Sequence, residues 1–362
     1  MLLSPEKNIF ISPTAFKESL SARGLSEFIQ SYLFNRGFRN LSYFPGSDGG
    51  NSFLEALSAG YEGKFVKIQI PLIAARTTVD ENIFLFNDEK TAAIETASVI
   101  GLERVPLAKR HPLQLNSKPL GIAIRKIQSL FPSVSKVWIG LGGTATIDLG
   151  AGLLEGLGFQ FLDESGKQIS AIPSNFDQIS SVVPSSEPVP ELHFYYDVKV
   201  PIRSESGSFI RVYGPQKGLE PKEVTVLEKS SARLINLFGL NSLLTGAGGA
   251  LALFPEKVLK TKFLPGTKEI SALHSFKTQF EKADIIITGE GRLDSQSFQG
   301  KWVTAFLDSE KPVLCLCGQV ESGLKLPQNW IVASISELES DPEKSKQQVK
   351  SHLRTLLDRY IV

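Results

Sequence analysis

Strand and helix patterns alternate at both ends of the 362-residue chain, and the alternation is interrupted in the middle. Short apolar runs predict strands at residues 8–12, 40–44, 283–288, 312–317 and 330–334. Apolar residues at helical spacing predict helices at residues 17–36, 52–60, 299–308 and 342–360. Repeated strand–helix alternation is typical of a parallel sheet that is covered by helices on both faces. We therefore expect an α/β protein.

The middle of the chain lacks the regular strand–helix alternation of the two ends. It contains the Pro-rich residues 183–190 and a hairpin-like pattern at residues 159–169, which turns at residues 164–166. At 362 residues the chain also exceeds the size at which one hydrophobic core stops growing, so about two domains are expected. The sequence thus predicts a discontinuous domain of residues 1–70 plus 265–362, with a second domain of residues 71–264 inserted into it.

The charge balance limits the partners. Lys and Arg number 39 against 38 Asp and Glu, and 42% of the residues are hydrophobic, which is an ordinary globular composition. A formal charge of +1 supplies no long-range field for a polyanion or an acidic membrane surface. We expect neither nucleic acid nor a membrane as partner, so an anionic ligand has to be held by local geometry.

Cysteine content and the N-terminal segment favour the cytoplasm. Cys315 and Cys317 share one apolar run and are expected to be core residues rather than a disulfide. The first residues lack the apolar region of a secretory signal, and no apolar stretch approaches the roughly 20 residues of a membrane span. A monomer and a homodimer both remain open.

Polar loops follow the first two predicted strands, where ligands bind in parallel α/β sheets. Lys17 and Ser19 stand at the start of the first helix, where a cation and free backbone N–H groups suit a carboxylate or phosphate. The alternative is that Ser19 only caps the helix and Lys17 is solvated. Asp48 sits in a turn with Gly49 and Gly50, which allows close approach of a ligand, although Asp-Gly is also a common turn.

The inserted region has its own glycine-rich turn at residues 140–152, between a predicted strand and a helical run. Gly142, Gly143 and Thr144 suit a phosphate cradle, and Asp148 follows them. The third glycine of a dinucleotide fingerprint is missing at the required spacing, and no Gly-Lys-Ser/Thr follows as in a P-loop. Further candidate ligand-binding positions in this region are Asp197, residues 214–218 and residues 246–249.

The densest group of ionisable residues follows the strand at residues 283–288. Glu290 lies between two glycines, and within a few residues come Arg292, Asp294, Ser295, Gln296 and Lys301. Carboxylates can hold Mg²⁺ or accept a hydroxyl proton, and cations can neutralise a transferring phosphoryl group. This combination indicates phosphoryl transfer without a P-loop.

In these motifs the chain resembles the type-1 glycerate kinases, which transfer the ATP γ-phosphoryl group to a hydroxyl of D-glycerate. The motifs occur in the same order as in that family: Phe16-Lys17-Glu18-Ser19-Leu20-Ser21-Ala22, Asp48-Gly49-Gly50, Gly142-Gly143-Thr144-Ala145-Thr146, Gly214-Pro215-Gln216-Lys217-Gly218 and Ile287-Thr288-Gly289-Glu290-Gly291-Arg292-Leu293-Asp294-Ser295-Gln296. The resemblance implies a flavodoxin-like, three-layer discontinuous domain with an inserted α/β domain, a need for ATP and Mg²⁺, and an active site in the interdomain cleft.

The resemblance also leads to role assignments for a kinase of a small hydroxy acid, with glycerate as the default acceptor. The catalytic candidates are Asp48 or Asp294 for the acceptor hydroxyl, and Lys17 and Arg292 for its carboxylate or the moving phosphoryl group. Mg²⁺ is assigned to Glu290 or Asp197, and the nucleotide to Gly142, Gly143, Thr144 and Asp148. The substrate-binding candidates are Ser19, Gly49, Gly50, Gln216, Lys217, Ser295, Gln296 and Lys301.

Several positions depart from the family pattern. Thr14 replaces an Asp, Asn51 a Glu and Ile147 an Asn, and Lys199-Val200 stands where Asp-Asn is usual. Because specificity rests on the few polar groups that meet a substrate, these changes leave the acceptor open. A non-catalytic nucleotide-binding or ligand-binding member of the same fold is therefore the alternative hypothesis. The missing dinucleotide fingerprint argues against an NAD-linked oxidoreductase.

Overall fold

The structure is a computed structural model and describes residues 3–16, 18–75, 77–197, 200–204, 207–241 and 246–361. The chain forms two compact units. The first unit consists of Met1–Tyr61 and Pro265–Val362, and the second of Glu62–Leu264. The first break falls earlier than residue 70, where the sequence patterns put it. The reason is that β3 (Gly63–Pro71) pairs along its whole length with β4 (Thr78–Phe86) of the second unit.

The first unit is built on a five-stranded sheet in the order β16-β15-β14-β1-β2. Its strands are β1 (Ile9–Ile11), β2 (Leu41–Tyr43), β14 (Ile285–Leu293), β15 (Val313–Val320) and β16 (Trp330–Ser334). All four neighbouring pairs are parallel. The parallel α/β sheet expected from the strand–helix alternation is therefore confirmed.

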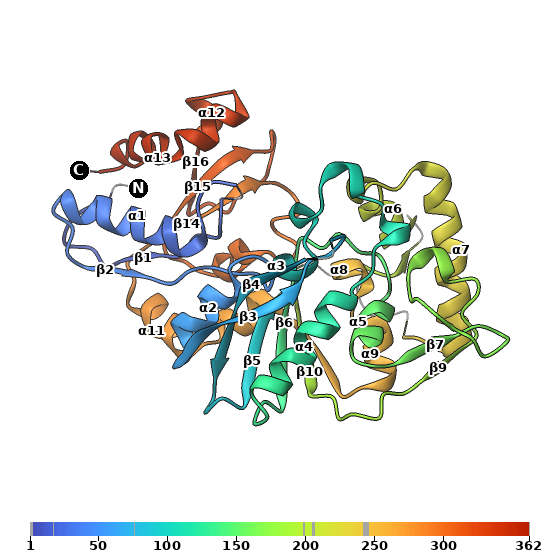
Figure 1. Cartoon of the computed structure of the whole chain (residues 1–362). Helices are drawn as coiled ribbons and strands as arrows, with labels where there is room; N and C mark the ends of the chain where they lie inside the picture. Colours follow the sequence, from blue (N-terminus) through green and yellow to red (C-terminus); the bar gives the residue numbers. More distant parts are fainter. Residues whose placement is uncertain are drawn as a thin grey trace. The chain divides into compact units, whose positions relative to one another are not determined.

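Helical segments cover both faces of this sheet (Figure 1). Alternate strand residues point to opposite faces, so Ile9 and Ile11 pack with α1 (Ala22–Asn35) and α13 (Val349–Asp358) in one apolar cluster. Phe10 faces the other way and lies 5.3 Å from Phe276 of α11 (His274–Lys282), measured between ring centroids. The remaining helical segments of this unit are α2 (Phe53–Gly60), α10 (Gly266–Ser271), α12 (Pro342–Gln347), η6 (Trp302–Phe306) and η7 (Ile335–Glu337).

Four elements of this unit differ from the sequence predictions. The helix predicted from residue 17 begins at Ala22 as α1. β14 continues to Leu293 instead of ending at residue 288, because its residues keep pairing with β15 as far as Val320. Residues 299–308 contain the 3-10 segment η6 and not an α-helix. The final helix is two helices, because Gln348 between them leaves the helical conformation at φ −107° and ψ 18°.

The second unit contains a six-stranded mixed sheet in the order β13-β10-β6-β5-β4-β3. Its further strands are β5 (Thr91–Glu95), β6 (Lys136–Leu141), β10 (Glu191–Tyr196) and β13 (Thr261–Pro265). β5, β6 and β10 are parallel neighbours, whereas β3, β4 and β5 pair antiparallel. The hairpin expected at residues 159–169 is present, since β7 (Gln160–Leu162) pairs antiparallel with β8 (Gln168–Ile169).

The core of this unit is one large apolar cluster to which its strands and helices contribute buried residues. The α-helices are α3 (Thr96–Ile100), α4 (Lys118–Leu130), α5 (Ala151–Gly156), α6 (Phe209–Tyr213), α7 (Pro221–Phe238), α8 (Ala247–Ala250) and α9 (Leu253–Val258). The smaller elements are β9 (Ser181–Val183), β11 (Arg203–Ser204), β12 (Gly207–Ser208), η1 (Leu102–Arg104), η2 (Leu107–Lys109), η3 (Pro112–Gln114), η4 (Pro173–Asn175) and η5 (Pro215–Lys217). None of the helices formed by the described residues has the length and apolar character needed to cross a bilayer.

Candidate functional site

Glu290 is a buried carboxyl group near the end of β14. Only 7% of the residue is exposed, and it lies opposite Cys317 of β15. Its Oε1 atom is buried and has no hydrogen-bond partner. Burial raises the pKa of Glu290 to about 7, with Asp48 and Asp294 adding to the rise and Lys301 and the Ser297 hydroxyl opposing it. Glu290 therefore exchanges a proton near neutral pH, and one of its oxygens is unused.

Lys301 and Asp294 complete the cluster around Glu290. Lys301 Nζ lies 3.7 Å from Glu290 Oε2 and 3.7 Å from Asp294 Oδ1. Asp294 Oδ1 also accepts hydrogen bonds from the backbone N–H groups of Gln296 and Ser297, both at 3.1 Å. Asp294 is thus fixed by its own turn, and the Lys301 ammonium group interacts with two carboxylates.

The other sequence candidates on this segment face solvent. The Arg292 side chain is 65% exposed, and its Nε lies 3.5 Å from Asp294 Oδ2. Ser295 and Gln296 are exposed, and the Ser295 N–H donates to Glu321 Oε2 at 2.7 Å. These residues form the outer rim of the cluster and are open to a ligand from solvent.

Asp48 belongs to the same unit, at the turn after β2. Its Oδ1 accepts a hydrogen bond from the Gly50 N–H at 3.1 Å, and Gly49 adopts a left-handed φ of 96°. Its charge adds to the raised pKa of Glu290, so the two carboxyl groups interact electrostatically. The structure therefore links the Asp48 turn to the segment of Glu290.

Two residues that the sequence analysis missed hold these loops. A Cβ atom at Gly266 would come within 2.1 Å of the Asp48 carbonyl oxygen, so only glycine fits there. The Thr267 hydroxyl donates to the Gly300 carbonyl at 2.7 Å, directly before Lys301. The start of α10 thereby supports both loops. The Pro-Gly-Thr sequence there is a turn signal that marks this position, although it does not reveal the contacts.

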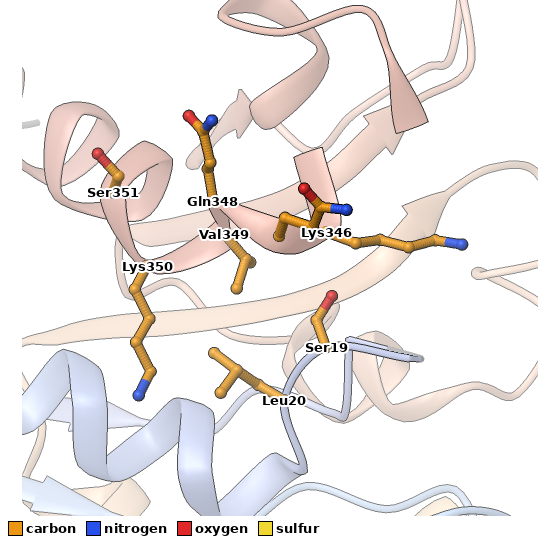
Figure 2. A pocket seen from close by; sticks show the side chains of 8 residues that line it. Ser19, Leu20, Lys346, Gln348, Val349, Lys350 and Ser351 are labelled. Atoms are coloured by element: carbon orange, nitrogen blue, oxygen red, sulfur yellow. The ribbon is translucent and has the colours of Figure 1, made fainter. Parts of the chain in front are cut away.

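Ser19 lies away from this cluster in the contacts described and lines a pocket of the first unit, about 580 Å³ in volume. The other walls are Leu20 and the α12–α13 region, residues 346–351 (Figure 2). The Ser19 hydroxyl and the ammonium group of Lys346 extend into the space between these segments. Lys346 is already paired with Glu18 and with Glu343. Ser19 does not cap α1, because the Ser21 side chain does so by accepting from the Gly24 N–H. Lys17 lies outside the described residues.

In the second unit, the loop after β6 carries the glycine-rich turn. Gly143 is exposed with a left-handed φ of 61°, and its carbonyl accepts from the Leu102 N–H at 2.7 Å. The Gly142 N–H donates to Thr96 Oγ1 at 3.0 Å. Lys217 approaches this loop from η5, and its Nζ donates to Thr144 Oγ1 at 3.0 Å and to the Thr146 carbonyl at 2.9 Å.

Lys217 is buried, with 5% of the residue exposed. Burial lowers the pKa of Lys217 to about 7, and the nearby charge of Asp148 acts in the opposite direction. A substrate cannot reach the ammonium group directly, although the sequence analysis expected such a contact. Its neighbour Gln216 is exposed.

Asp148 is fully buried and its carboxylate is already occupied. Oδ2 accepts from the Ser117 N–H and hydroxyl, both at 2.7 Å, and from the Gly152 N–H at 3.1 Å. Burial raises the pKa of Asp148, and these hydrogen bonds oppose the rise. The carboxylate joins the start of α4 to the start of α5, so this geometry supports a structural role instead of the expected nucleotide contact.

Asp197 and the departures from the family motifs have separate environments. Asp197 follows β10 and is half-buried, and burial together with its charge raises the pKa of Tyr213 to about 12. The Thr14 hydroxyl donates to the Gly289 carbonyl at 3.2 Å, and Ile147 is fully buried. Asn51 and Val200 are partly buried, whereas Lys199 lies outside the described residues.

The described residues contain no group of three or more His, Cys, Asp or Glu side chains arranged to hold a metal ion. Mg²⁺ is commonly held by one or two carboxylates together with substrate phosphates and water. The unpartnered Oε1 of Glu290 fits one such ligand position.

Comparison with known proteins shows which family the chain belongs to. A model of the glycerate kinase family matches residues 9–361. Glycerate kinase of Neisseria meningitidis serogroup B is 31% identical over 359 residues, which cover 92% of this chain and 92% of that protein. Glycerate 2-kinase of Escherichia coli K12 is 29% identical over 308 residues, covering 81% and 79% of the two chains. A crystal structure of a protein from Salmonella typhimurium LT2, provisionally named glycerate kinase 2, has a TM-score of 0.71 and 26% identity, and covers 97% of both chains. The chain belongs to the glycerate kinase family.

Proposed function

We propose that this protein is an ATP-dependent kinase that phosphorylates a hydroxyl group of a small hydroxy acid, and that glycerate is its first candidate acceptor. The observation that carries the proposal is the cluster of Glu290, Lys301 and Asp294, where one ammonium group lies 3.7 Å from each of two carboxylates. Phosphoryl transfer needs positioning and charge neutralisation more than covalent chemistry. The carboxylates of this cluster can position a metal ion or a hydroxyl group, and its ammonium group can neutralise negative charge.

The strand order supports the finer fold assignment. Numbered within the first unit alone, the five parallel strands follow the order 2-1-3-4-5, which is the order of flavodoxin-like sheets. Ligands of such sheets bind beyond the carboxyl ends of the strands. Asp48 follows β2, while Glu290 and Asp294 lie at the end of β14, so all three occur where the fold favours a ligand.

The residues of the first unit divide into three roles under this proposal. Asp48 orients the acceptor hydroxyl and accepts its proton. Lys301 and Arg292 neutralise charge on the acceptor carboxylate or on the phosphoryl group in transfer. Asp294 holds Lys301 in place through its fixed turn, since its Oδ1 atom is already bound by two backbone N–H groups.

The nucleotide and metal have their own residues. ATP supplies the phosphoryl group, and Mg²⁺ supplies charge neutralisation on its phosphates. Glu290 is the carboxylate proposed for Mg²⁺, because its Oε1 has no other partner. Gly142, Gly143 and Thr144 are proposed for the phosphates. Asp148 is not proposed as a nucleotide contact, because four hydrogen-bond donors already occupy its carboxylate.

The test is acceptor-dependent release of ADP by the purified protein. ATP and Mg²⁺ are supplied with D-glycerate, L-glycerate, glycolate, lactate or tartronate, and ADP is measured against a reaction without acceptor. The proposal expects one of these hydroxy acids to stimulate ADP release at least tenfold. Nucleotide binding without stimulation by any acceptor would instead support a non-catalytic member of the family and would end the kinase proposal.

A further inference from the structure

Lys217 is a buried cation without an anionic partner at contact distance. Only 5% of the residue is exposed, and no carboxylate oxygen of the described residues lies within 4.0 Å of its Nζ. Its two hydrogen-bond acceptors, Thr144 Oγ1 and the Thr146 carbonyl, are both neutral. Removing a cation from water without pairing it is costly. A fold that buries a lysine in this way points to an anion from outside the chain, which would keep the lysine charged.

The charged groups around Lys217 do not supply the missing anionic partner. Asp148 acts on it electrostatically, but the Asp148 carboxylate is held by Ser117, Gly150 and Gly152. On the other side, the Arg110 backbone lies against Gly218, and the Arg110 guanidinium donates to the Val105 carbonyl. Each neighbouring charge is already engaged with other groups.

The loop above Lys217 presents unused donors. Within the part of the chain that the structure describes, the N–H groups of Gly143 and Thr144 have no acceptor. Successive free N–H groups next to a residue with left-handed φ, here Gly143 at 61°, form an anion-binding concavity. Thr146 Oγ1, in a fully buried residue of the same loop, also lacks a hydrogen-bond partner.

Thr144 connects the buried cation to this concavity. When Lys217 is charged, its ammonium group only donates, so Thr144 Oγ1 then acts as its acceptor. The Thr144 O–H group therefore has to donate elsewhere, and the described residues offer it no acceptor. An oxygen of an anion at Gly143 and Thr144 would satisfy this hydroxyl together with the two N–H groups.

We propose that Lys217 is the internal countercharge of a phosphate-binding loop formed by Gly142, Gly143 and Thr144, and that it acts on a bound nucleotide through the Thr144 hydroxyl. Lys217 is a positioning residue in this proposal, because it does not touch the nucleotide. The inference rests on the proposed function, since it takes the ligand to be the nucleotide of the kinase reaction.

A proton accompanies the nucleotide as a consequence. The Lys217 ammonium group has a pKa of about 7 in the free protein, and an anion close to it raises that value. Above pH 7 the free protein carries Lys217 mostly neutral and the complex carries it charged, so binding takes up a proton. The affinity then falls by up to about tenfold for each unit of pH.

The experiment measures ADP binding to the full-length protein by calorimetry at pH 7.5 and pH 8.5, in two buffers of different ionisation enthalpy. The terminal phosphate of ADP is essentially ionised at both pH values, as its pKa is about 6. We expect the unmodified protein to take up most of a proton and to bind up to about tenfold more weakly at pH 8.5. Lys217→Met is expected to bind at least about tenfold more weakly at pH 7.5, with the proton uptake abolished.

Two further variants keep the result interpretable. Thr144→Val retains the buried lysine and removes the hydroxyl, so it is expected to lower ADP affinity about tenfold even if Lys217→Met fails to fold. Lys222→Met removes an exposed lysine at the start of α7, whose side chain is 81% exposed, and should match the unmodified protein.

The outcomes separate this inference from the proposed function. Unchanged ADP affinity and pH dependence in both Lys217→Met and Thr144→Val overturn the inference while leaving the kinase proposal intact. Lys217-dependent ADP binding without turnover of any acceptor supports the inference and removes the catalytic proposal. No ADP binding by the unmodified protein rejects both.

Discussion

Lys301 Nζ lies 3.7 Å from Glu290 Oε2, at the long end of an ion pair, while burial keeps the pKa of Glu290 at about 7. The cation is close enough to attract the carboxylate but does not compensate for its removal from water. Lys301 is equally distant from Asp294 Oδ1, so its charge is divided between two acids. An arrangement of this kind is poorly optimised for stability and is typical of a site that awaits a ligand.

Replacing Glu290 with Gln is therefore expected to lower turnover. The amide keeps the shape but lacks the negative charge proposed to hold Mg²⁺, so kcat should fall by about a hundredfold or more. Acceptor-dependent ADP release at saturating ATP measures the effect. Glu310→Gln, a change at an exposed residue of the same unit, is the matched control and should retain full activity. Equal turnover in both variants would exclude Glu290 from the chemistry.

The same substitution is expected to stabilise the protein at alkaline pH. The ordinary pKa of a Glu side chain is 4.5 and the pKa of Glu290 in the folded protein is about 7, so between these pH values the folded state binds more protons than the unfolded state. The free energy of unfolding therefore falls as pH rises through this interval, by roughly 3 kcal/mol at most from this group.

Urea denaturation at pH 5 and pH 8 measures this effect. The stability of Glu290→Gln minus that of the unmodified protein should rise between the two pH values, and the subtraction removes the contributions of other titrating groups. A difference that stays constant between pH 5 and pH 8 would mean that the carboxyl group is already ionised at pH 5.

Gly266→Ala is expected to destabilise the first unit. The new Cβ atom would lie 2.1 Å from the Asp48 carbonyl oxygen and 2.5 Å from the Gly49 Cα, both backbone atoms that cannot move aside cheaply. Such overpacking costs about 1–3 kcal/mol. Thermal unfolding of Gly266→Ala is compared with that of Lys268→Ala, an exposed position two residues further along α10. Similar melting temperatures for the two variants would contradict the close contact between Gly266 and the Asp48 turn.

The sequence patterns identified the parallel sheet and most of its strands, because an apolar run such as Ile9–Ile11 can only be buried inside it. They placed Glu290 and Arg292 in a loop, whereas both lie on β14. Apolar periodicity marks where a strand starts being buried, but the end of β14 depends on backbone pairing with polar residues such as Gln319. The 3-10 segment at Trp302–Phe306 was equally hidden, since its apolar spacing resembles that of an α-helix.

The site was less predictable than the fold. Residue type and order indicated the carboxylates and cations, because phosphoryl transfer restricts the useful side chains. Residue type did not distinguish Asp148, whose fully buried carboxylate is enclosed by donors, from Asp48, which is only partly buried and accepts from the Gly50 N–H. The burial of Lys217 was also invisible, because it depends on residues distant in sequence, such as Thr144 at the other end of its hydrogen bond. Polar candidates can thus be found from sequence, whereas their partners require the structure.

Asp148→Asn is expected to weaken the fold and leave nucleotide binding by the folded protein unchanged. The Asn oxygen can take the place of Oδ2 but is neutral, and the amide nitrogen then faces the Gly150 N–H, so the buried donors of Ser117 and Gly152 lose a charged acceptor. Each such loss costs about 1.5–3 kcal/mol, and a decrease of about 3 kcal/mol or more in the free energy of unfolding is expected. Urea denaturation measures this decrease, and ADP affinity is measured at a temperature where the variant is folded.

Ser117→Ala is the control, because it removes the hydroxyl but keeps the Ser117 N–H. It should lower the free energy of unfolding by less, and the two changes should combine non-additively because they share one acceptor. Normal stability combined with lost ADP binding would instead return Asp148 to the nucleotide site.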